Sequence, residues 1–209
     1  MSETKDRILM TALRLFAQDG YEATSVSRIA GELGMTKGAL YKHYKNKRDI
    51  FDSIFEQVCR SDIERSQMAG IPEEDFSVMP QPFCETSVES VRAFIEAQFD
   101  YWAEDETACN FRKLLTLEQY RNSEMAALYQ KVFGSGPVSF IEDLFREMMQ
   151  QGLWREGDPL QMAVAFYAPF YLLLSVLDTV SAKDERAEIK HIFRTHTACF
   201  IDKYALEKA

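Results

Sequence analysis

Apolar residues recur every three or four positions along most of the chain, which is the spacing of an amphipathic α-helix. The first such stripe covers residues 8–16, and Asp19-Gly20 provides a stop after it. Alternating apolar and polar positions, which would indicate strands, are scarce. The pattern therefore predicts an all-α fold of about nine helices. The apolar positions of the first helix are Ile8, Leu9, Ala12, Leu13 and Phe16.

Two short helices and then a longer one are predicted next. Thr24 or Ser25 can cap the first short helix, and Thr36 can cap the second. Asn46-x-x-Asp49 is a variant of the capping box and predicts the start of the longer helix. The apolar positions of the two short helices are Val26, Ile29, Ala30 and Leu33, then Leu40, Tyr41 and Tyr44.

The helical pattern breaks at residues 70–86, where one glycine and three prolines fall close together and predict a loop. It resumes at Val88. Asp158-Pro159 starts a long helix, since proline is tolerated in a first helical turn. The helices predicted after the loop cover residues 88–102, 108–121, 124–133, 137–152, 159–177 and 189–200.

Residues 159–177 carry no charge and are almost long enough to cross a bilayer. The segment nevertheless contains Gln161, Pro169 and Ser175, lies between two aspartates, and lacks a flanking Lys or Arg. We expect a buried or interface helix and no membrane association. The first ten residues contain no long apolar run, and the four cysteines form no C-x-x-C pair. These features predict a cytoplasmic protein.

Charge is distributed unevenly along the 209 residues. Residues 1–50 hold nine Lys or Arg and six Asp or Glu, whereas residues 51–209 hold fifteen basic and twenty-seven acidic residues. The net charge is therefore +3 in the first segment and −12 in the second, within a total of −9. We expect two domains, residues 1–50 and residues 51–209, of which only the first attracts nucleic acid.

The segment from Thr24 to Phe51, TSVSRIAGELGMTKGALYKHYKNKRDIF, has the layout of a helix-turn-helix. Ala30 is small where the two helices must pack closely, and Gly34 stands where the turn requires a positive φ. The second helix is expected to be about seven residues long. It is polar on one side, as a recognition helix in the major groove would be. Its exposed positions are Thr36, Lys37, Lys42 and His43.

The same segment contains a set of spaced residues that occur together in a known family. They are Gly20, Tyr21, Thr24, Ser25, Val26, Ile29, Ala30, Gly34, Lys37, Gly38, Leu40, Tyr41, His43, Tyr44 and Lys47. On these residues the chain resembles the TetR/AcrR transcriptional regulators over about residues 5–52. The rest of the chain resembles them only in architecture. Met35 and Asn46 depart from the family pattern.

The resemblance implies a role for each residue that matches the family pattern. Phosphate contacts are implied for Thr24 or Ser25, Tyr41, His43 and Lys47. Contacts in the major groove are implied for Thr36, Lys37, Gly38 and Lys42, of which Lys42 could equally contact the backbone. The residue chemistry agrees, because hydroxyl and basic groups commonly bind DNA phosphates. For each position the alternative is an ordinary solvated side chain, or for Tyr44 a place in the core.

Aromatic side chains of the predicted second domain, residues 51–209, could line a cavity for an apolar or aromatic effector. The alternative is that they fill a core or a dimer interface. Pro169 could open space by bending its helix. Glu96, Asp100 and Glu118 would favour a cationic effector if they pointed inward. The candidate cavity residues are Phe94, Phe99, Trp102, Phe111, Tyr120, Phe166, Tyr167 and Phe170.

The sequence contains few features that are typical of an enzyme. It contains no G-x-S-x-G, Walker or G-x-G-x-x-G pattern, and His191 and His196 are spaced five apart, which does not suit a metal pair on a helix. We expect neither catalytic residues, nor a metal, nor a cofactor. The predicted function is a ligand-responsive repressor that binds a palindromic operator as a homodimer. The resemblance places the dimer contact on the last two helices. The alternatives are an all-α ligand-binding protein or enzyme whose helix-turn-helix is structural only, and a protein–protein adaptor.

Overall fold

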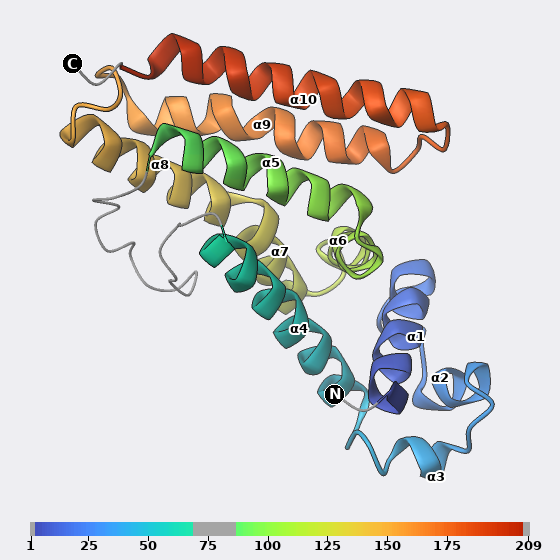
Figure 1. The fold of residues 1–209 in the computed structure, drawn as a ribbon. Coiled ribbons are helices and arrows are strands. Elements are labelled where there is room, and N and C mark those ends of the chain that lie inside the picture. The colour runs from blue at the N-terminus through green and yellow to red at the C-terminus, as the bar shows by residue number, and fades with distance from the viewer. Residues whose placement is uncertain (1–2, 69–86, 207–209) are drawn as a thin grey trace. The chain divides into compact units, whose positions relative to one another are not determined.

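The computed structural model describes residues 3–68 and 87–206, so the predicted loop at 70–86 lies outside the described residues. The described residues form ten helices, and their only β-type pairing is an isolated bridge between Trp154 and Ala205 (Figure 1). The all-α prediction is confirmed. The helices are α1 (Glu3–Asp19), α2 (Val26–Glu32), α3 (Lys37–Leu40), α4 (Lys47–Met68), α5 (Val88–Glu104), α6 (Glu106–Glu118), α7 (Ser123–Phe133), α8 (Ser135–Gln150), α9 (Pro159–Leu177) and α10 (Lys183–Tyr204).

Short-range polar contacts fix several helix starts where the sequence predicted them. Asn46 Oδ1 accepts the Asp49 N–H at 2.8 Å at the start of α4, and Asp49 Oδ2 accepts the Lys45 N–H at 2.8 Å. This is a reciprocal cap of the predicted kind, shifted by one residue on the carboxylate side. Asp158 caps α9, and Pro159 occupies its first turn.

The chain divides into two compact units. Unit 1 contains Met1–Asp62 and Glu104–Tyr129, and unit 2 contains Ile63–Ala103 and Gln130–Ala209. Unit 1 therefore includes α6 and part of α7 together with the helix-turn-helix, because α1 packs along α6. The predicted domain boundary at residue 50 stays a prediction.

The core of unit 1 is built on the apolar stripe of α1. Every predicted position of that stripe is buried, and Ile8 and Phe16 are fully so. Phe111 of α6 is also fully buried and lies between Phe51 and Phe55 of α4, with ring centres 6.4 and 6.0 Å apart. These contacts connect α4 and α6 within the unit.

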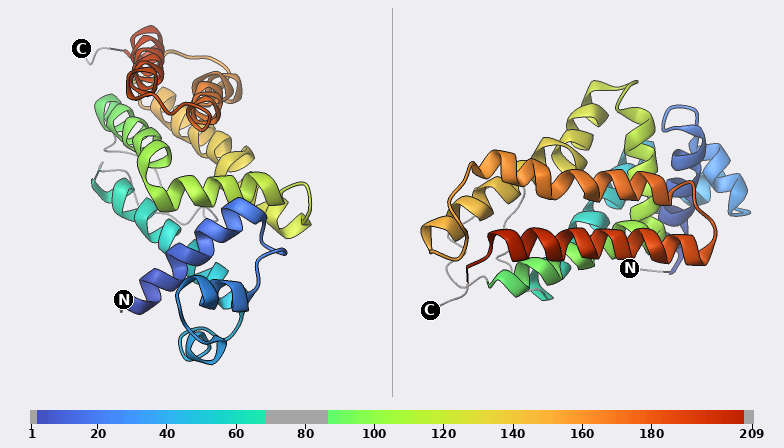
Figure 2. Two further views of the ribbon diagram at one scale, coloured as in Figure 1. Left: turned by 90° about the vertical axis from the view of Figure 1, so that its right-hand side faces the viewer. Right: turned by 90° about the horizontal axis from the view of Figure 1, so that it is seen from above.

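Unit 2 is built around α9, which packs against both α8 and α10. In both views of Figure 2, α10 runs alongside α9. The aromatic ring of Phe99 on α5 stacks on that of Phe193 on α10 at 4.1 Å and meets Phe170 on α9 edge-on at 5.5 Å. The helix α9 continues through Pro169 without interruption. Stacked rings therefore fill the space between α5, α9 and α10 at this level.

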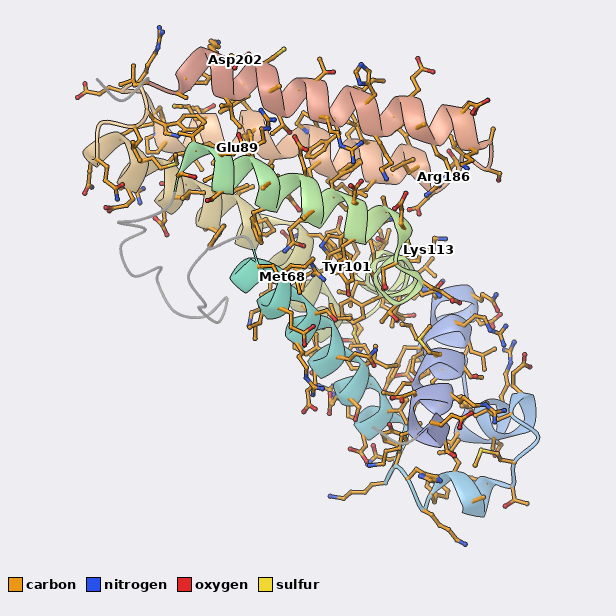
Figure 3. The ribbon with its side chains drawn as sticks, viewed as in Figure 1. Met68, Glu89, Tyr101, Lys113, Arg186 and Asp202 are labelled. Carbon is orange, nitrogen blue, oxygen red and sulfur yellow. The ribbon has the colours of Figure 1, made fainter. Side chains whose placement is uncertain are left out.

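An arginine that the sequence did not single out fastens the turn between α9 and α10. Arg186, labelled in Figure 3, donates to the carbonyls of Leu177 and Val180 at 2.8 and 3.1 Å. It also donates to the carbonyl of Ala103, in the last turn of α5, at 2.9 Å. One side chain thus satisfies carbonyls at the ends of two helices.

The helix α9 has the length and composition of a possible membrane span, with a mean hydropathy of 1.8 over an 18-residue window. Its side chains Phe166, Phe170 and Leu174 are buried within unit 2. Core helices of soluble proteins have the same properties, so this single helix is weak evidence for a span.

Candidate nucleic-acid interface

The turn between α2 and α3 has the geometry that the sequence predicted. Gly34 adopts a φ of +65°, in the left-handed region that favours glycine. The Gly34 N–H donates to the Gly31 carbonyl at 3.1 Å, and the Met35 N–H donates to the Ala30 carbonyl at 2.8 Å. These two bonds form a Schellman ending of α2. They fix the direction in which the chain enters α3.

Each short helix has its own cap. Ser25 Oγ accepts the Arg28 N–H at 3.1 Å at the start of α2, and Thr36 Oγ1 accepts the Ala39 N–H at 3.1 Å at the start of α3. The helix α3 is shorter than predicted, a single turn that continues as turns through His43. A helix of this length depends on its cap and its packing, because isolated turns are unstable.

Most of the predicted DNA-contacting side chains lie on the surface of unit 1. Tyr41 is 44% exposed, with the Lys37 ammonium 5.7 Å from its ring centre, and His43 is half-buried. A Cβ added at Gly38 would meet no atom within 4 Å, so the fold itself does not require glycine there. The exposed members of the set are Ser25, Thr36, Lys37, Gly38, Tyr41 and Lys42.

Two tyrosines of the family pattern belong to the core of unit 1. Tyr44 is 5% exposed and Tyr21 is 8% exposed. Burial raises the pKa of both phenol groups above the usual value, because it disfavours the charged phenolate. The interpretation of Tyr44 as a core residue is confirmed.

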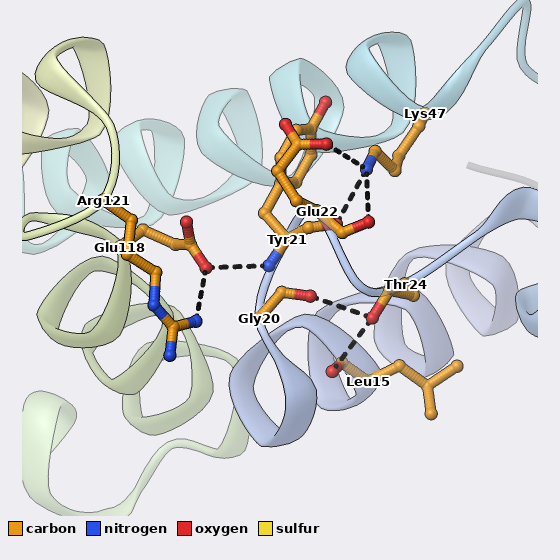
Figure 4. Close-up of polar contacts among 8 residues, drawn as sticks. All are labelled: Leu15, Gly20, Tyr21, Glu22, Thr24, Lys47, Glu118 and Arg121. Carbon is orange, nitrogen blue, oxygen red and sulfur yellow. Dashed lines mark hydrogen bonds and ion pairs between the residues drawn. The ribbon is translucent and has the colours of Figure 1, made fainter.

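The side chain of Thr24, which was predicted as a phosphate contact in alternative to Ser25, faces the interior of unit 1. Thr24 is fully buried, and its hydroxyl donates to the carbonyls of Gly20 at 3.0 Å and Leu15 at 3.3 Å (Figure 4). Because Ser25 takes the cap of α2, Thr24 is left to turn inward and tie the α1–α2 loop to α1.

The ammonium group of Lys47 is bound within unit 1. It donates to the carbonyl of Tyr21 at 2.8 Å and that of Glu22 at 3.5 Å, and it lies 3.3 Å from the Glu22 carboxylate (Figure 4). It also lies 4.1 Å from the centre of the Tyr21 ring. Contact between Lys47 and a phosphate would require the ammonium to give up at least one of these acceptors.

A second basic residue of α4 joins two helices of unit 1. Arg48 donates two hydrogen bonds to the Glu124 carboxylate of α7, at 2.8 and 2.6 Å, and one to Asp52 at 2.7 Å. The Arg48 hydrogen bonds lower the pKa of the Glu124 carboxyl below its usual value. Arg48 therefore holds α4 against α7, and sequence spacing alone did not indicate this pairing.

The predicted cavity residues do not form one group. Five of them are buried in unit 2, where they contact other side chains or backbone: Tyr167 donates to the Phe133 carbonyl at 3.1 Å, and the Trp102 ring lies 4.7 Å from that of Phe133. Phe94 is half-buried. The five buried residues are Phe99, Trp102, Phe166, Tyr167 and Phe170.

The other two predicted cavity residues, Phe111 and Tyr120, lie in unit 1 and not with the five buried residues of unit 2. Phe111 is packed in the core described above, and Tyr120 is 85% exposed. Both lie on or after α6, whose inner face contacts α1. Spacing along a helix identifies a face but not what that face packs against, which is why neither residue could be placed from the sequence.

The acidic residues considered for a cationic effector have protein partners. Asp100 pairs with Lys190 at 2.9 Å and with Arg194 at 2.7 Å. Glu118 is 2% exposed and accepts the Tyr21 N–H at 3.0 Å. Within residues 3–68 and 87–206, no group of three or more His, Cys, Asp or Glu side chains is placed to hold a metal ion.

Comparison with known proteins agrees with the geometry of unit 1. A family model described as bacterial regulatory proteins, tetR family, matches residues 8–54. The chain is 40% identical over 79 residues to the HTH-type transcriptional regulator AcrR of Shigella flexneri, covering 37% of each protein. It is 34% identical over 170 residues to the uncharacterized HTH-type transcriptional regulator YerO of Bacillus subtilis (strain 168), covering 73% of this chain and 54% of YerO. These matches span about a third to a half of the two relatives.

The fold of the whole chain is also found in a solved structure. SmeT, the repressor of the Stenotrophomonas maltophilia multidrug efflux pump SmeDEF, in its complex with triclosan matches with a TM-score of 0.67 and 22% identity. The match covers 99% of this chain and 93% of SmeT. The helix-turn-helix geometry, the match to the tetR-family model and the similarity to the relatives lead to one conclusion. The chain belongs to the TetR/AcrR family of bacterial transcriptional regulators.

Proposed function

We propose that this chain is a repressor that binds a specific palindromic operator and leaves it when a small molecule binds. The observation that carries the proposal is the capped helix-turn-helix, in which Lys37 of α3 and Lys42 of the turn after α3 are exposed, as is the cap residue Thr36. The match of residues 8–54 to a tetR-family model supports it. The relatives are named as regulators, which favours this function over an all-α enzyme or an adaptor. A cytoplasmic location follows, because the operator is there.

Two kinds of DNA contact are proposed for the exposed surface of unit 1. Ser25, Tyr41 and His43 would bind phosphates and fix the orientation of the domain, which carries no sequence information. Base edges in the major groove would be contacted by Thr36, Lys37 and Lys42, with Gly38 allowing close approach. Lys47 would join the phosphate contacts only after rearrangement.

A homodimer is proposed through one face of α9 and α10. Five apolar residues at intervals of four lie along α9, and four of them are large and 39–62% exposed. A solvent-facing row of this kind would normally be polar. Ile192 of α10 is 48% exposed as well. A second copy seated on this face would give the two-fold symmetry that a palindromic operator requires. The row on α9 is Leu160, Val164, Ala168, Leu172 and Val176.

The effector is proposed to bind in unit 2 and to be apolar or aromatic. Aromatic rings are concentrated there, and SmeT, which has the same fold, was solved with the aromatic molecule triclosan. The effector releases DNA if it binds more tightly to a conformation in which the two helix-turn-helix units no longer fit the operator. Equal affinity for both conformations would produce no response.

Selection of bound duplexes from a random DNA pool at moderate salt tests the proposal directly. We expect enrichment of an inverted repeat, because each half-site is contacted by one protomer. Binding that persists without enrichment would contradict a specific operator. Absence of binding even at low salt, where phosphate contacts are strongest, would contradict the DNA-binding function altogether.

Replacing Lys37 with alanine is expected to reduce affinity for the selected operator about tenfold to a hundredfold, which is the range for one lost base contact. Affinity for a random duplex should change by less than about threefold, because most of the positive charge remains. Titrations of both duplexes at one salt concentration measure the ratio. Lys183→Ala, an exposed lysine of unit 2, removes the same charge and serves as control. Equal losses in both variants would mean that Lys37 contributes charge alone.

A further inference from the structure

Both backbone groups of Tyr21 are bound by side chains from distant parts of unit 1 (Figure 4). The Tyr21 N–H donates to Glu118 Oε1, in the last turn of α6, at 3.0 Å. The Tyr21 carbonyl accepts from the Lys47 ammonium, at the start of α4, at 2.8 Å. One residue of the α1–α2 loop is therefore fixed to α6 through its N–H and to α4 through its carbonyl.

The Glu118 carboxylate is closely enclosed. Glu118 is 2% exposed, and its Oε1 lies 3.5 Å from the guanidinium of Arg121, whose side chain is 61% exposed. A Cβ added at Gly20 would lie 2.8 Å from this oxygen and 2.9 Å from Arg121 Nη1. Gly20 also has a φ of +94°. Glycine at position 20 thus serves the loop conformation and leaves room for the carboxylate.

Displacement of this loop would be transmitted to α2 and α3. Thr24 binds the loop to Gly20 and Leu15, and the next residue, Ser25, caps α2. The Schellman bonds from Gly34 and Met35 then fix the turn into α3. These links are the hydroxyl bonds of Thr24, the Ser25 cap and the backbone bonds of the turn. We therefore expect α2 and α3 to move with the loop as one body.

We propose that Glu118 is a positioning residue for operator binding, an inference that rests on the proposed function. Its carboxylate holds the Tyr21 N–H and so sets the orientation of the helix-turn-helix relative to α6, while Lys47 holds the same residue from α4. A shift of α6 against α4 would pull on opposite sides of one peptide segment. Glu118 contacts no DNA in this arrangement, because its side chain is buried.

Geometry and charge predict opposite results when Glu118 is replaced. Removing an acidic group from the DNA-binding unit reduces repulsion of phosphates and, by charge alone, should strengthen binding slightly. Loss of the Tyr21 contact should weaken binding to the operator, since the contacting side chains are no longer held in register. The sign of the change therefore separates a positioning role from a general electrostatic effect.

The experiment compares Glu118→Ala, Glu118→Gln and the control Glu106→Ala in the full chain. Glu106 is an exposed acid on the same helix and gives the same change in charge. We expect Glu118→Ala to lower affinity for the selected operator about tenfold, because a hydrogen bond to a charged group is lost. Glu118→Gln should stay within about threefold of the unaltered chain, since its amide oxygen can still accept the Tyr21 N–H. Glu106→Ala should bind equally or more tightly.

Amide hydrogen exchange provides a measurement that needs no DNA. In Glu118→Ala, the peptide covering residues 17–24 should exchange about tenfold faster or more, while peptides within residues 3–16 of α1 should not change. Operator affinity in Glu118→Ala equal to that in Glu106→Ala, or unchanged exchange at residues 17–24, would overturn the proposal. If Glu118→Ala does not fold, a tenfold loss of affinity in folded Glu118→Gln would also overturn it. If the unaltered chain selects no operator, the proposed function fails, and the exchange result still tests the Tyr21 contact by itself.

Discussion

Replacing Leu172 with glutamate is expected to convert the proposed homodimer into monomers and to lower operator affinity about a hundredfold or more. Leu172 is 62% exposed, the most exposed large residue of the apolar row on α9. In a two-fold symmetric dimer the substitution places two unpaired carboxylates in one apolar interface. Each costs several kcal/mol unless it finds a partner. A monomer binds only one half-site and loses the gain from joining two binding events.

Sedimentation velocity at micromolar concentration measures the first effect, and titration with the selected operator measures the second. Ile63→Glu is the control, because Ile63 is 42% exposed on α4 and lies outside the α9 and α10 face. Ile63→Glu should sediment as the unaltered chain does. A Leu172→Glu variant that sediments as the unaltered chain does would show that this row is not the contact between protomers.

In the candidate nucleic-acid interface, the features that the sequence predicted well depend on contacts between residues a few positions apart. Gly34 ends α2 because the turn bonds run to Ala30 and Gly31, and Thr36 caps α3 by binding Ala39. Residue type and spacing are enough to specify such contacts. The same holds for the caps that begin α4 and α9.

The side-chain contacts that the sequence did not predict join residues that are far apart in the chain, or replace a surface position with a buried one. Thr24 and Lys47 have residue types that suit phosphate contact, but the fold offers both of them backbone carbonyls first. Glu118 lies 97 residues from the Tyr21 N–H that it binds. No local pattern specifies such a pair. The sequence shows only a glycine at position 20, and it is the structure that gives this residue a positive φ and a close approach to Glu118.

The aromatic residues of unit 2 are a second case in which the sequence did not reveal the packing partner. Phe99, Phe166 and Phe170 were predicted either to line a cavity or to fill a core or a dimer interface, and all three are buried. Helical spacing could not distinguish a ring that lines a cavity from a ring that another ring covers. That distinction depends on which helix lies opposite, and for Phe99 the opposite rings are Phe193 and Phe170.

Replacing Phe99 with alanine is expected to destabilise the protein by about 3–5 kcal/mol, the usual cost of deleting a packed core ring. Phe99 is 1% exposed, and its ring stacks on Phe193 with an angle of 11° between the planes. For a chain of this size the melting temperature should fall by about 10 °C. Thermal unfolding at a fixed protein concentration measures the change, because melting of a dimer depends on concentration.

Tyr120→Ala is the matched control, because Phe99 and Tyr120 are both aromatic residues that the sequence offered for the same cavity. Tyr120 is 85% exposed, so its loss should change stability by less than about 0.5 kcal/mol. Phe99→Leu keeps part of the ring volume and should give an intermediate loss. If Phe99→Ala cost as little as Tyr120→Ala, the ring would border open space instead of packed side chains. The middle of unit 2 would then be the place to seek the effector, and a bound aromatic molecule should raise the melting temperature of the unaltered chain more than that of the variant.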